Sequence, residues 1–186
     1  MNIKVNDDSY VSVGFGDVRA DYKTSGFDTI KEGDLFKAAE FGLTPNISNL
    51  GRGNYRFTVW HIDKTDLVDK GYGFALSFDQ ELNKKLGLFG RYGYTNPKVS
   101  TIENFVSGGF VIRDPWGIQG DLFGFGMSWH ETSITKEDEF AVEVFHRIQA
   151  TKLLQITPSI LLIFDPVLSD KTNPVVVFGL RARVLF

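Results

Sequence analysis

The residues of this chain that could do chemistry are arginines and carboxylates, which recur at alternate positions of extended segments. Guanidinium groups donate hydrogen bonds and carboxylates accept them. Gathered on one surface, they could bind a polar solute, or they could pair with one another and brace a wall. Both interpretations stay open for each residue taken singly. The candidates are Arg56, Asp79, Arg91, Glu143, Arg147, Asp165, Arg181 and Arg183, and Glu40 belongs to the same set.

Histidine chemistry is the alternative. His61, His130 and His146 stand in separate segments, without the spacing of metal ligands and without a nearby carboxylate motif, so no metal site is expected. A hydrolase would need a nucleophile, a base and an orienting acid, and His146 with a serine such as Ser159 is the only pairing to consider. Because no motif supports it, we expect a protein that is not an enzyme and that uses no cofactor.

The last fourteen residues, 173–186, show which kind of element carries these charges. They read NPVVVFGLRARVLF, and one of the two alternate rows carries Gly179, Arg181 and Arg183. Since successive side chains of a strand point to opposite faces, the segment is predicted to be a strand with one polar and one oily face. The oily row comprises Val176, Phe178, Leu180, Ala182, Val184 and Phe186.

Nine earlier segments show the same alternation and are also predicted to be strands. They follow one another at roughly even spacing, and no helical periodicity extends over a useful window. This favours an up-and-down antiparallel sheet over βαβ units. The segments have about the length that a tilted membrane strand needs. They are 9–17, 35–44, 54–63, 71–82, 86–94, 102–113, 121–131, 140–151 and 154–165.

Composition fits an all-β protein and excludes several classes of function. The 186 residues suggest one domain, and their 19 glycines and 17 phenylalanines suit hairpins and large outward side chains. The formal charge of −3, with both signs interspersed, gives no sign of nucleic-acid binding. The lack of cysteine excludes disulfides and thiolate metal sites. A mean hydropathy of −0.09 would suggest a soluble protein, but alternating strands cancel their own hydropathy signal.

Two-faced strands fit either a soluble β-sandwich or a membrane barrel. In a sandwich the apolar rows would form the core. In a barrel, lipid would cover them, water inside would solvate the arginines, and closure of the last strand against the first would remove the sheet edges. The abundance of outward phenylalanine favours the barrel. The outward aromatics that could form girdles at the membrane interfaces are Tyr55, Tyr72, Tyr92, Tyr94 and Trp129.

Several segments together resemble the C-terminal part of the carbohydrate-selective porins of the OprB family, in order and in spacing. The resemblance implies a sixteen-stranded outer-membrane barrel that lets sugars diffuse passively, with charged residues, arginines prominent, at a narrowed waist. The segments are FKAAEFGLTP at 36–45, GNYRFTVW at 53–60, GYGFALSFDQEL at 71–82, LGLFGRYG at 86–93, GDLFGFGMSW at 120–129 and the terminal VFGLRARVLF.

The chain departs from that family pattern in two ways. It has room for only about ten strands, and its first residues, MNIKVNDDSY, lack the apolar stretch of a secretory signal. We therefore expect residues 1–186 to form a single porin-type β-barrel domain, an antiparallel up-and-down transmembrane β-barrel that is incomplete at its N-terminus.

The expected function is passive diffusion of carbohydrates and other small hydrophilic solutes across a bacterial outer membrane. Sugars would be weakly bound permeants, and outer-membrane lipid would surround the barrel. By the same resemblance, the barrel-assembly machinery would recognise the last strand, which ends in Phe186. Two alternatives stay open: an outer-membrane structural or adhesive barrel, and a soluble β-sandwich binding module without transport. The oligomeric state stays open as well.

Overall fold

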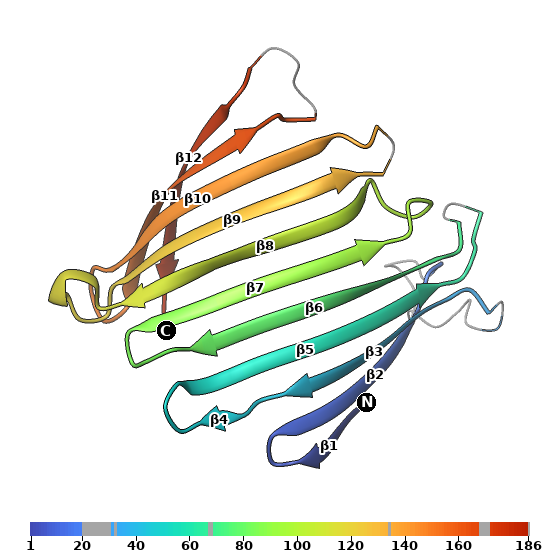
Figure 1. Ribbon diagram of the computed structural model, residues 1–186, viewed down its shortest axis with the longest axis horizontal. Coiled ribbons are helices and arrows are strands. Elements are labelled where there is room, and N and C mark those ends of the chain that lie inside the picture. The colour runs from blue at the N-terminus through green and yellow to red at the C-terminus, as the bar shows by residue number, and fades with distance from the viewer. Residues whose placement is uncertain (20–30, 32, 67–68, 134, 168–171, 186) are drawn as a thin grey trace.

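The computed structural model contains one continuous β-sheet (Figure 1) and describes residues 1–19, 31, 33–66, 69–133, 135–167 and 172–185. Besides the strands, one short 3-10 turn, η2 (Pro115–Gly117), is formed in those residues. The strands are β1 (Asn2–Asn6), β2 (Ser9–Asp17), β3 (Leu35–Leu43), β4 (Asn46–Ile47), β5 (Gly51–Ile62), β6 (Gly71–Glu81), β7 (Leu86–Thr95), β8 (Ile102–Arg113), β9 (Leu122–Thr132), β10 (Asp138–Gln149), β11 (Leu154–Phe164) and β12 (Val175–Val184).

The strands lie side by side in the order of the sequence. The sheet runs from β1 at one edge to β12 at the other, each neighbouring pair is antiparallel, and only β4 is off this path, paired with β5. This up-and-down arrangement confirms the predicted topology. The ten predicted strands correspond to β2, β3 and β5 to β12. The five-residue β1 and the two-residue β4 have no counterpart among them. The sequence of β1, NIKVN, does alternate, but it is shorter than the segments of about nine residues or more that were predicted to be strands.

The sheet has a single layer in the described part of the chain. No apolar side chain of the described strands is buried, and Phe178 and Leu180 are 78% and 77% exposed. A β-sandwich would bury such rows between two sheets. The sandwich interpretation is therefore wrong, and the apolar rows form a surface of the molecule.

The strand register places polar and apolar rows on opposite faces. Directly paired residues of neighbouring strands share a face of the sheet. Phe57 of β5 pairs with Leu76 of β6, whereas Arg56 of β5 pairs with Ser77 of β6, which in turn pairs with Arg91 of β7. We call the face that holds Phe57 the apolar face and the face that holds Arg56 the polar face.

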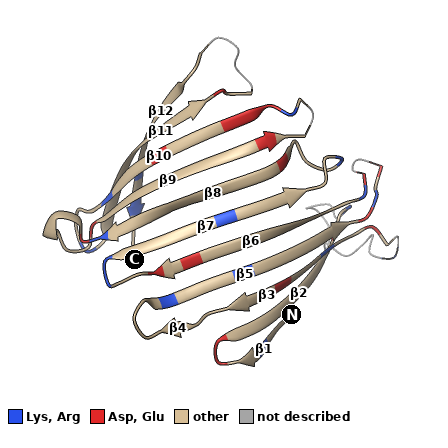
Figure 2. Cartoon of the chain, viewed as in Figure 1, with Lys and Arg blue, Asp and Glu red and all other residues tan. Residues whose placement is uncertain are grey.

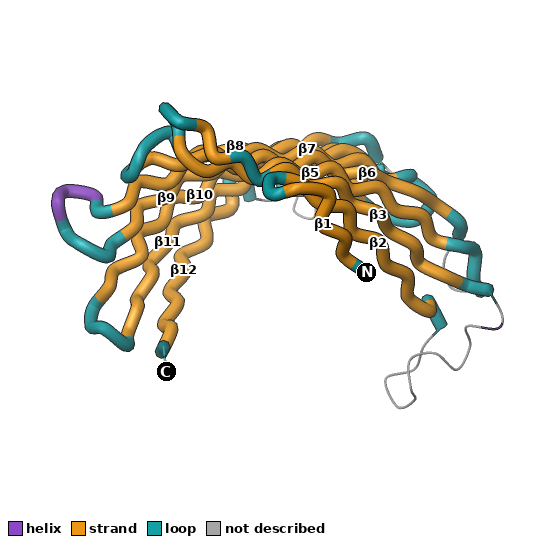
Figure 3. The backbone as a smooth tube through the Cα atoms, turned by 90° about the horizontal axis from the view of Figure 1, so that it is seen from below, coloured by secondary structure: helices purple, strands orange, loops and turns teal. Residues whose placement is uncertain are grey.

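The sheet curves into an open arch (Figure 3). Its edges, β1 and β12, do not pair with each other, so the expected closure of the last strand against the first does not occur within this chain. The predicted recognition of Phe186 lies outside the described residues. In the part of the chain that the structure describes, no helix combines the length and the apolar character needed to cross a membrane.

Candidate functional site

Seven of the eight predicted site residues lie on the polar face. Charged positions occur within β5, β6, β7, β10 and β12 as well as in the loops (Figure 2). Glu40 of β3 joins the seven, because it pairs with Thr58, a polar-face residue of β5. The seven are Arg56 of β5, Asp79 of β6, Arg91 of β7, Glu143 and Arg147 of β10, and Arg181 and Arg183 of β12.

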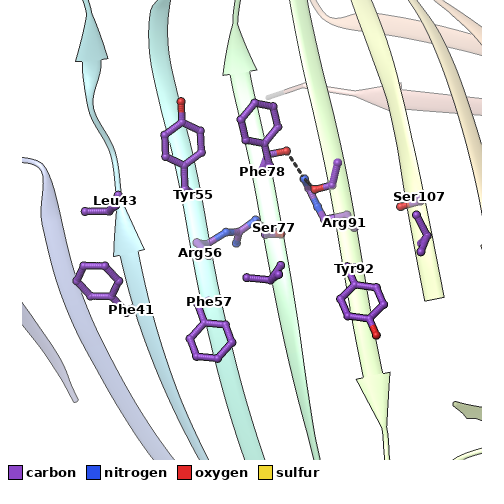
Figure 4. A pocket seen from close by; sticks show the side chains of 13 residues that line it. Phe41, Leu43, Tyr55, Arg56, Phe57, Ser77, Phe78, Arg91, Tyr92 and Ser107 are labelled. Atoms are coloured by element: carbon purple, nitrogen blue, oxygen red, sulfur yellow. Dashed lines mark hydrogen bonds between the residues drawn. The ribbon is translucent and has the colours of Figure 1, made fainter. Parts of the chain in front are cut away.

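The carboxylate of Asp79 lies between two guanidinium groups. Arg91 Nη2 is 2.6 Å from Asp79 Oδ1, and Arg56 Nη2 is 3.7 Å from Asp79 Oδ2. Arg91 Nη1 also donates to the backbone oxygens of Phe78 and Gly90, at 2.6 and 2.8 Å (Figure 4). We call Arg56, Asp79 and Arg91 the paired cluster. It joins the neighbouring strands β5, β6 and β7, which supports the bracing interpretation for these residues.

Two further sets of contacts extend this bracing. Glu40 accepts hydrogen bonds from Tyr10 Oη at 2.7 Å and from Thr58 Oγ1 at 2.8 Å. Across the start of β7, Arg113 Nη2 of β8 lies 2.9 Å from Glu81 Oε1 of β6. Glu81 and Arg113 are absent from the predicted set, although their positions in segments 71–82 and 102–113 put them in the same alternate rows as Asp79 and the other polar-face residues. That shared row is the signal that could have found them.

A second group of charges lies on β10 and β12. Arg147, Arg181, Arg183 and Glu143 line a cavity of about 530 Å³. In the part of the chain that the structure describes, none of these four side chains makes an ion pair or a hydrogen bond, and Arg147 Nε is buried without a partner. We call the three arginines the unpaired cluster. The contacts of the described residues therefore give the bracing interpretation no support here.

Two glycines leave room for side chains at the floor of this cavity, and the residues concerned lie on four neighbouring strands, β9 to β12. Gly179 of β12 pairs with Ser159 of β11, and a Cβ atom added at Gly179 would lie 2.5 Å from Ser159 Oγ. On the other side, the ring of Phe145 lies over Gly124 of β9, where an added Cβ would lie 2.2 Å from it. The Phe145 ring therefore leans away from β11, and the Ser159 hydroxyl stays accessible.

Asp165 is the one predicted site residue that does not lie on this face. It follows Phe164, the last residue of β11, and has a φ of 51°. Its N–H donates to Asn173 Oδ1 at 3.1 Å, and Asn173 Nδ2 donates to Asp165 Oδ1 at 2.6 Å. The structure places Asp165 in the connection between β11 and β12, because the strand ends one residue before the alternation would bring it onto the sheet.

His146 and Ser159 lie on opposite faces of the sheet. His146 pairs with Phe123 on the apolar face, whereas Ser159 pairs with Phe145 on the polar face. The partner of His146 is Asp121, whose Oδ2 lies 3.0 Å from His146 Nε2. The hydrolase pairing considered from the sequence is therefore wrong. Among the described residues, no group of three His, Asp or Glu side chains is placed to hold a metal ion.

Aromatic rings contact one another across the strands of the apolar face. Phe74 of β6 lies 5.7 Å from both Tyr92 and Tyr94 of β7, and Tyr55 of β5 stacks on Phe78 of β6 at 5.1 Å. Such cross-strand pairs stabilise a sheet. The rings of Tyr55, Phe78 and Tyr92 border a groove of about 570 Å³ (Figure 4). The register puts all five predicted girdle aromatics on this face: Tyr55, Tyr72, Tyr92, Tyr94 and Trp129.

Comparison with known proteins agrees with this geometry. Residues 48–186 match the family described as carbohydrate-selective porin, OprB family. The high-pH structure of Pseudomonas putida OprB has a TM-score of 0.82 and 16% identity, over 98% of this chain and 57% of that chain. The low-pH structure has a TM-score of 0.71 and 18% identity, over 98% and 52%. No curated protein matches the sequence.

The family match and the structural likeness support different statements. At 16% and 18% identity, the two solved structures show the fold, and this chain spans little more than half of their length. The family match over residues 48–186 covers most of the chain, and it includes strands β5 to β12, which carry both charged clusters. The chain therefore belongs to the carbohydrate-selective porin family OprB.

Proposed function

We propose that this protein forms part of an outer-membrane pore through which carbohydrates and other small hydrophilic solutes diffuse passively. The polar face lines the water-filled interior, and the apolar face contacts lipid. One observation carries the proposal: a single-layered sheet holds seven candidate charges on one face and exposed apolar rows on the other. Membership of the OprB family supports it.

The free energy of solvation decides which face meets which solvent. Arginine at the midplane of a bilayer costs about 2–4 kcal/mol when it faces lipid, and the polar face carries several arginines in neighbouring strands. The apolar face, with side chains such as Leu180 at 77% exposure, has the opposite preference, because water around it is unfavourable. Only a sheet that separates lipid from water satisfies both faces.

The charged rows support diffusion rather than a reaction. Guanidinium and carboxylate groups can exchange hydrogen bonds with successive hydroxyls of a sugar, which lowers the cost of removing its water shell. Binding has to stay weak so that the solute can leave. The family supports a transport channel and not an enzyme.

The proposed location is the outer membrane, and the proposed partners are sugars and membrane lipid. The assembly machinery would recognise the last strand through Phe186. Deletion of Phe186 is the test: folded protein in the outer membrane should decrease strongly, as measured by the gel mobility of unboiled samples. Normal assembly of the shortened chain would contradict this part of the proposal.

Pore activity is tested with the native protein in liposomes. In isotonic glucose the liposomes should swell, and the rate should fall as the sugar becomes larger. Sealed liposomes that contain correctly folded protein would contradict the pore and would leave the structural or adhesive barrel as the function.

The assignment of the faces is tested with two adjacent residues of β6. Leu76 lies on the apolar face and Ser77 on the polar face. Leu76→Glu should destabilise the inserted protein, because a carboxylate that faces lipid is unfavourable, whereas Ser77→Glu places a carboxylate between Arg56 and Arg91 and should not lower the unfolding midpoint in denaturant. Equal losses for both variants would show that the two faces do not meet different solvents.

A further inference from the structure

The connection between β8 and β9 holds a tryptophan outward at one end of the sheet. Trp116 is 74% exposed, and Ile118, two residues later, is 53% exposed. Figure 3 shows this connection, which contains η2, projecting beyond the neighbouring strands. Contact of such apolar surface with water is unfavourable, so the position of the ring points to a partner outside the chain.

The backbone of this connection is strained, and local contacts fix it. Trp116 has a φ of 55° and Asp114 a φ of 49°, and a bulky residue rarely adopts this left-handed region. Asp121, which is buried, accepts a hydrogen bond from the N–H of Gln149 at 2.9 Å, and its other oxygen lies 3.0 Å from His146 Nε2. Strain that surrounding contacts maintain in this way is concentrated at functional sites.

The indole ring lies over the end of the apolar face. Its centroid is 5.2 Å from the ring centroid of His146 and 6.0 Å from that of Phe123, both in edge-on arrangements. Phe123 and His146 pair with each other on this face. Trp116 therefore stands at the boundary between the apolar face and the turns, where an amphipathic ring can meet both lipid and water.

An apolar groove of about 370 Å³ begins beside His146. Asp121 holds the imidazole of His146 toward the β8–β9 connection, and so away from β11. The ring of Pro158 stays close to its own backbone, which leaves space above β11. The apolar-face side chains that line the groove are Phe123, Val144, His146, Pro158, Ile160 and Phe178.

A lysine without an ion pair lies at the same end of the sheet. Lys152 is exposed in the turn 150–153, and no carboxylate among the described residues pairs with it. This turn is next to the β8–β9 connection, because Gln149, the last residue of β10, is hydrogen-bonded to Asp121. An ammonium group at the level of the turns complements an anion such as phosphate.

We infer that this groove binds one glycerophospholipid of the surrounding membrane. The inference rests on the proposed insertion of the apolar face into lipid. An acyl chain would occupy the groove, the indole N–H of Trp116 would donate to an ester oxygen, and Lys152 would contact the phosphate. Short turns of membrane barrels face the periplasm, and the turns 82–85 and 150–153 at this end are short. The lipid would therefore belong to the periplasmic leaflet.

The test is quenching of tryptophan fluorescence by phospholipids with brominated acyl chains, added to the full chain in non-ionic detergent. Two variants each retain one ring of the apolar face: W60F/W129F retains Trp116, and W60F/W116F retains Trp129. Brominated phosphatidylglycerol should half-quench Trp116 at a mole fraction at least about tenfold below that for Trp129, as expected for bound and not merely surrounding lipid. Brominated diacylglycerol, which lacks the phosphate, should require a higher mole fraction than phosphatidylglycerol at Trp116.

Further variants in the W60F/W129F protein assign the effect to the groove. Val144→Phe fills the groove and keeps it apolar, so it should remove the tenfold difference. Val142→Phe, on the same strand and face but outside the groove, should keep it. Lys152→Gln should weaken phosphatidylglycerol binding by about threefold, the size of an exposed ion pair, and leave diacylglycerol binding unchanged.

The outcomes separate this inference from the pore function. Folded protein in which neither ring is quenched would contradict the insertion of the apolar face and with it the pore. Equal quenching of Trp116 and Trp129, equal binding of the two lipids at Trp116, or a difference that persists in Val144→Phe overturns the inference alone. So does a sedimentation mass of two chains in detergent that Val144→Phe reduces to one, because a second copy would then occupy the groove.

Discussion

Two regions of the polar face are built from the same residue types and differ in how their charges are satisfied. In the paired cluster on β5 to β7, the carboxylate of Asp79 contacts two arginines of neighbouring strands. In the unpaired cluster on β10 and β12, three arginines face a cavity, and no ion pair or hydrogen bond satisfies them within the described residues. The first region resembles a braced wall and the second resembles a binding site.

The difference between the regions depends on cross-strand neighbours and not on composition. Asp79 is a diagonal neighbour of an arginine on each side, because Arg56 and Arg91 both pair with Ser77, two residues away on the same strand and face. In the second region the positions next to the arginines hold Thr157 and Gln155, which bring a hydroxyl and an amide in place of a carboxylate. Charged side chains on one face of this sheet therefore form ion pairs or stay unpaired according to their immediate neighbours.

Removal of the shared carboxylate should have the largest effect on stability. Asp79→Ala leaves two arginines side by side without an anion and should lower the free energy of unfolding by about 1 kcal/mol, the upper end for partly solvated ion pairs. Glu143→Ala, the matched change in the second region, should have almost no effect. Urea unfolding in detergent, followed by intrinsic fluorescence, measures both. The double variant Asp79→Ala/Arg91→Ala should recover part of the loss, and equal losses for Asp79→Ala and Glu143→Ala would remove the distinction between the regions.

Introduction of a carboxylate should convert the second region into a copy of the first. Thr157→Asp places an acid between Arg147 and Arg181 and should raise the free energy of unfolding by about 1 kcal/mol, the upper end for a partly solvated ion pair. The same urea experiment measures it, with Thr157→Asn as the uncharged control of similar size. A lower midpoint for Thr157→Asp than for Thr157→Asn would show that these arginines are already compensated.

The ion pair of Glu81 with Arg113, which lies next to the paired cluster, should contribute less to stability than the paired cluster does. Glu81 and Arg113 have side chains that are 42% and 40% exposed, so water and salt screen their attraction. Arg113→Gln is expected to lower the free energy of unfolding by about 0.5 kcal/mol. The difference from the unchanged protein should shrink when the salt concentration is raised, and a loss that does not depend on salt would argue against an ionic contribution.

The smallest effect is expected at the strand end, outside both regions. Lys37 Nζ lies 2.8 Å from Asp63 Oδ2, and this hydrogen bond, with another from the N–H of Leu35, holds the pKa of Asp63 below its ordinary value. A lowered carboxyl pKa stabilises the folded state above the unfolded pKa, and the stabilisation is lost as the pH falls through the folded pKa. The difference in melting temperature between the native protein and Lys37→Met should therefore begin to shrink as the pH falls below about 4, the unfolded pKa, and it should be lost only below the lower folded pKa, as measured by circular dichroism.

The sequence by itself determined the strands and their two faces. The alternation of polar and apolar residues predicts ten strands that correspond to β2, β3 and β5 to β12. The alternate row in which each residue stands correctly assigns seven of the eight candidate charges to the polar face. Asp165 does not lie on the polar face, because the alternation of side chains does not show where a strand ends. The backbone turns at Asp165, which has a φ of 51°. The alternation also puts His146 in the apolar row of its strand and Ser159 in the polar row of the next strand. The two side chains therefore lie on opposite faces of the sheet.

Only the tertiary structure decided which charges meet. A shift of two residues in the register of two strands keeps every side chain on its face and yet gives each one a different neighbour. Alternation, which has a period of two residues, is the same before and after such a shift. The contacts of Asp79 with Arg56 and Arg91, and the lack of any partner for Arg147 in the described residues, follow from the register that turns and packing impose. For that reason the sequence predicts a charged face, and the folded sheet decides which of its charges are paired and which are not.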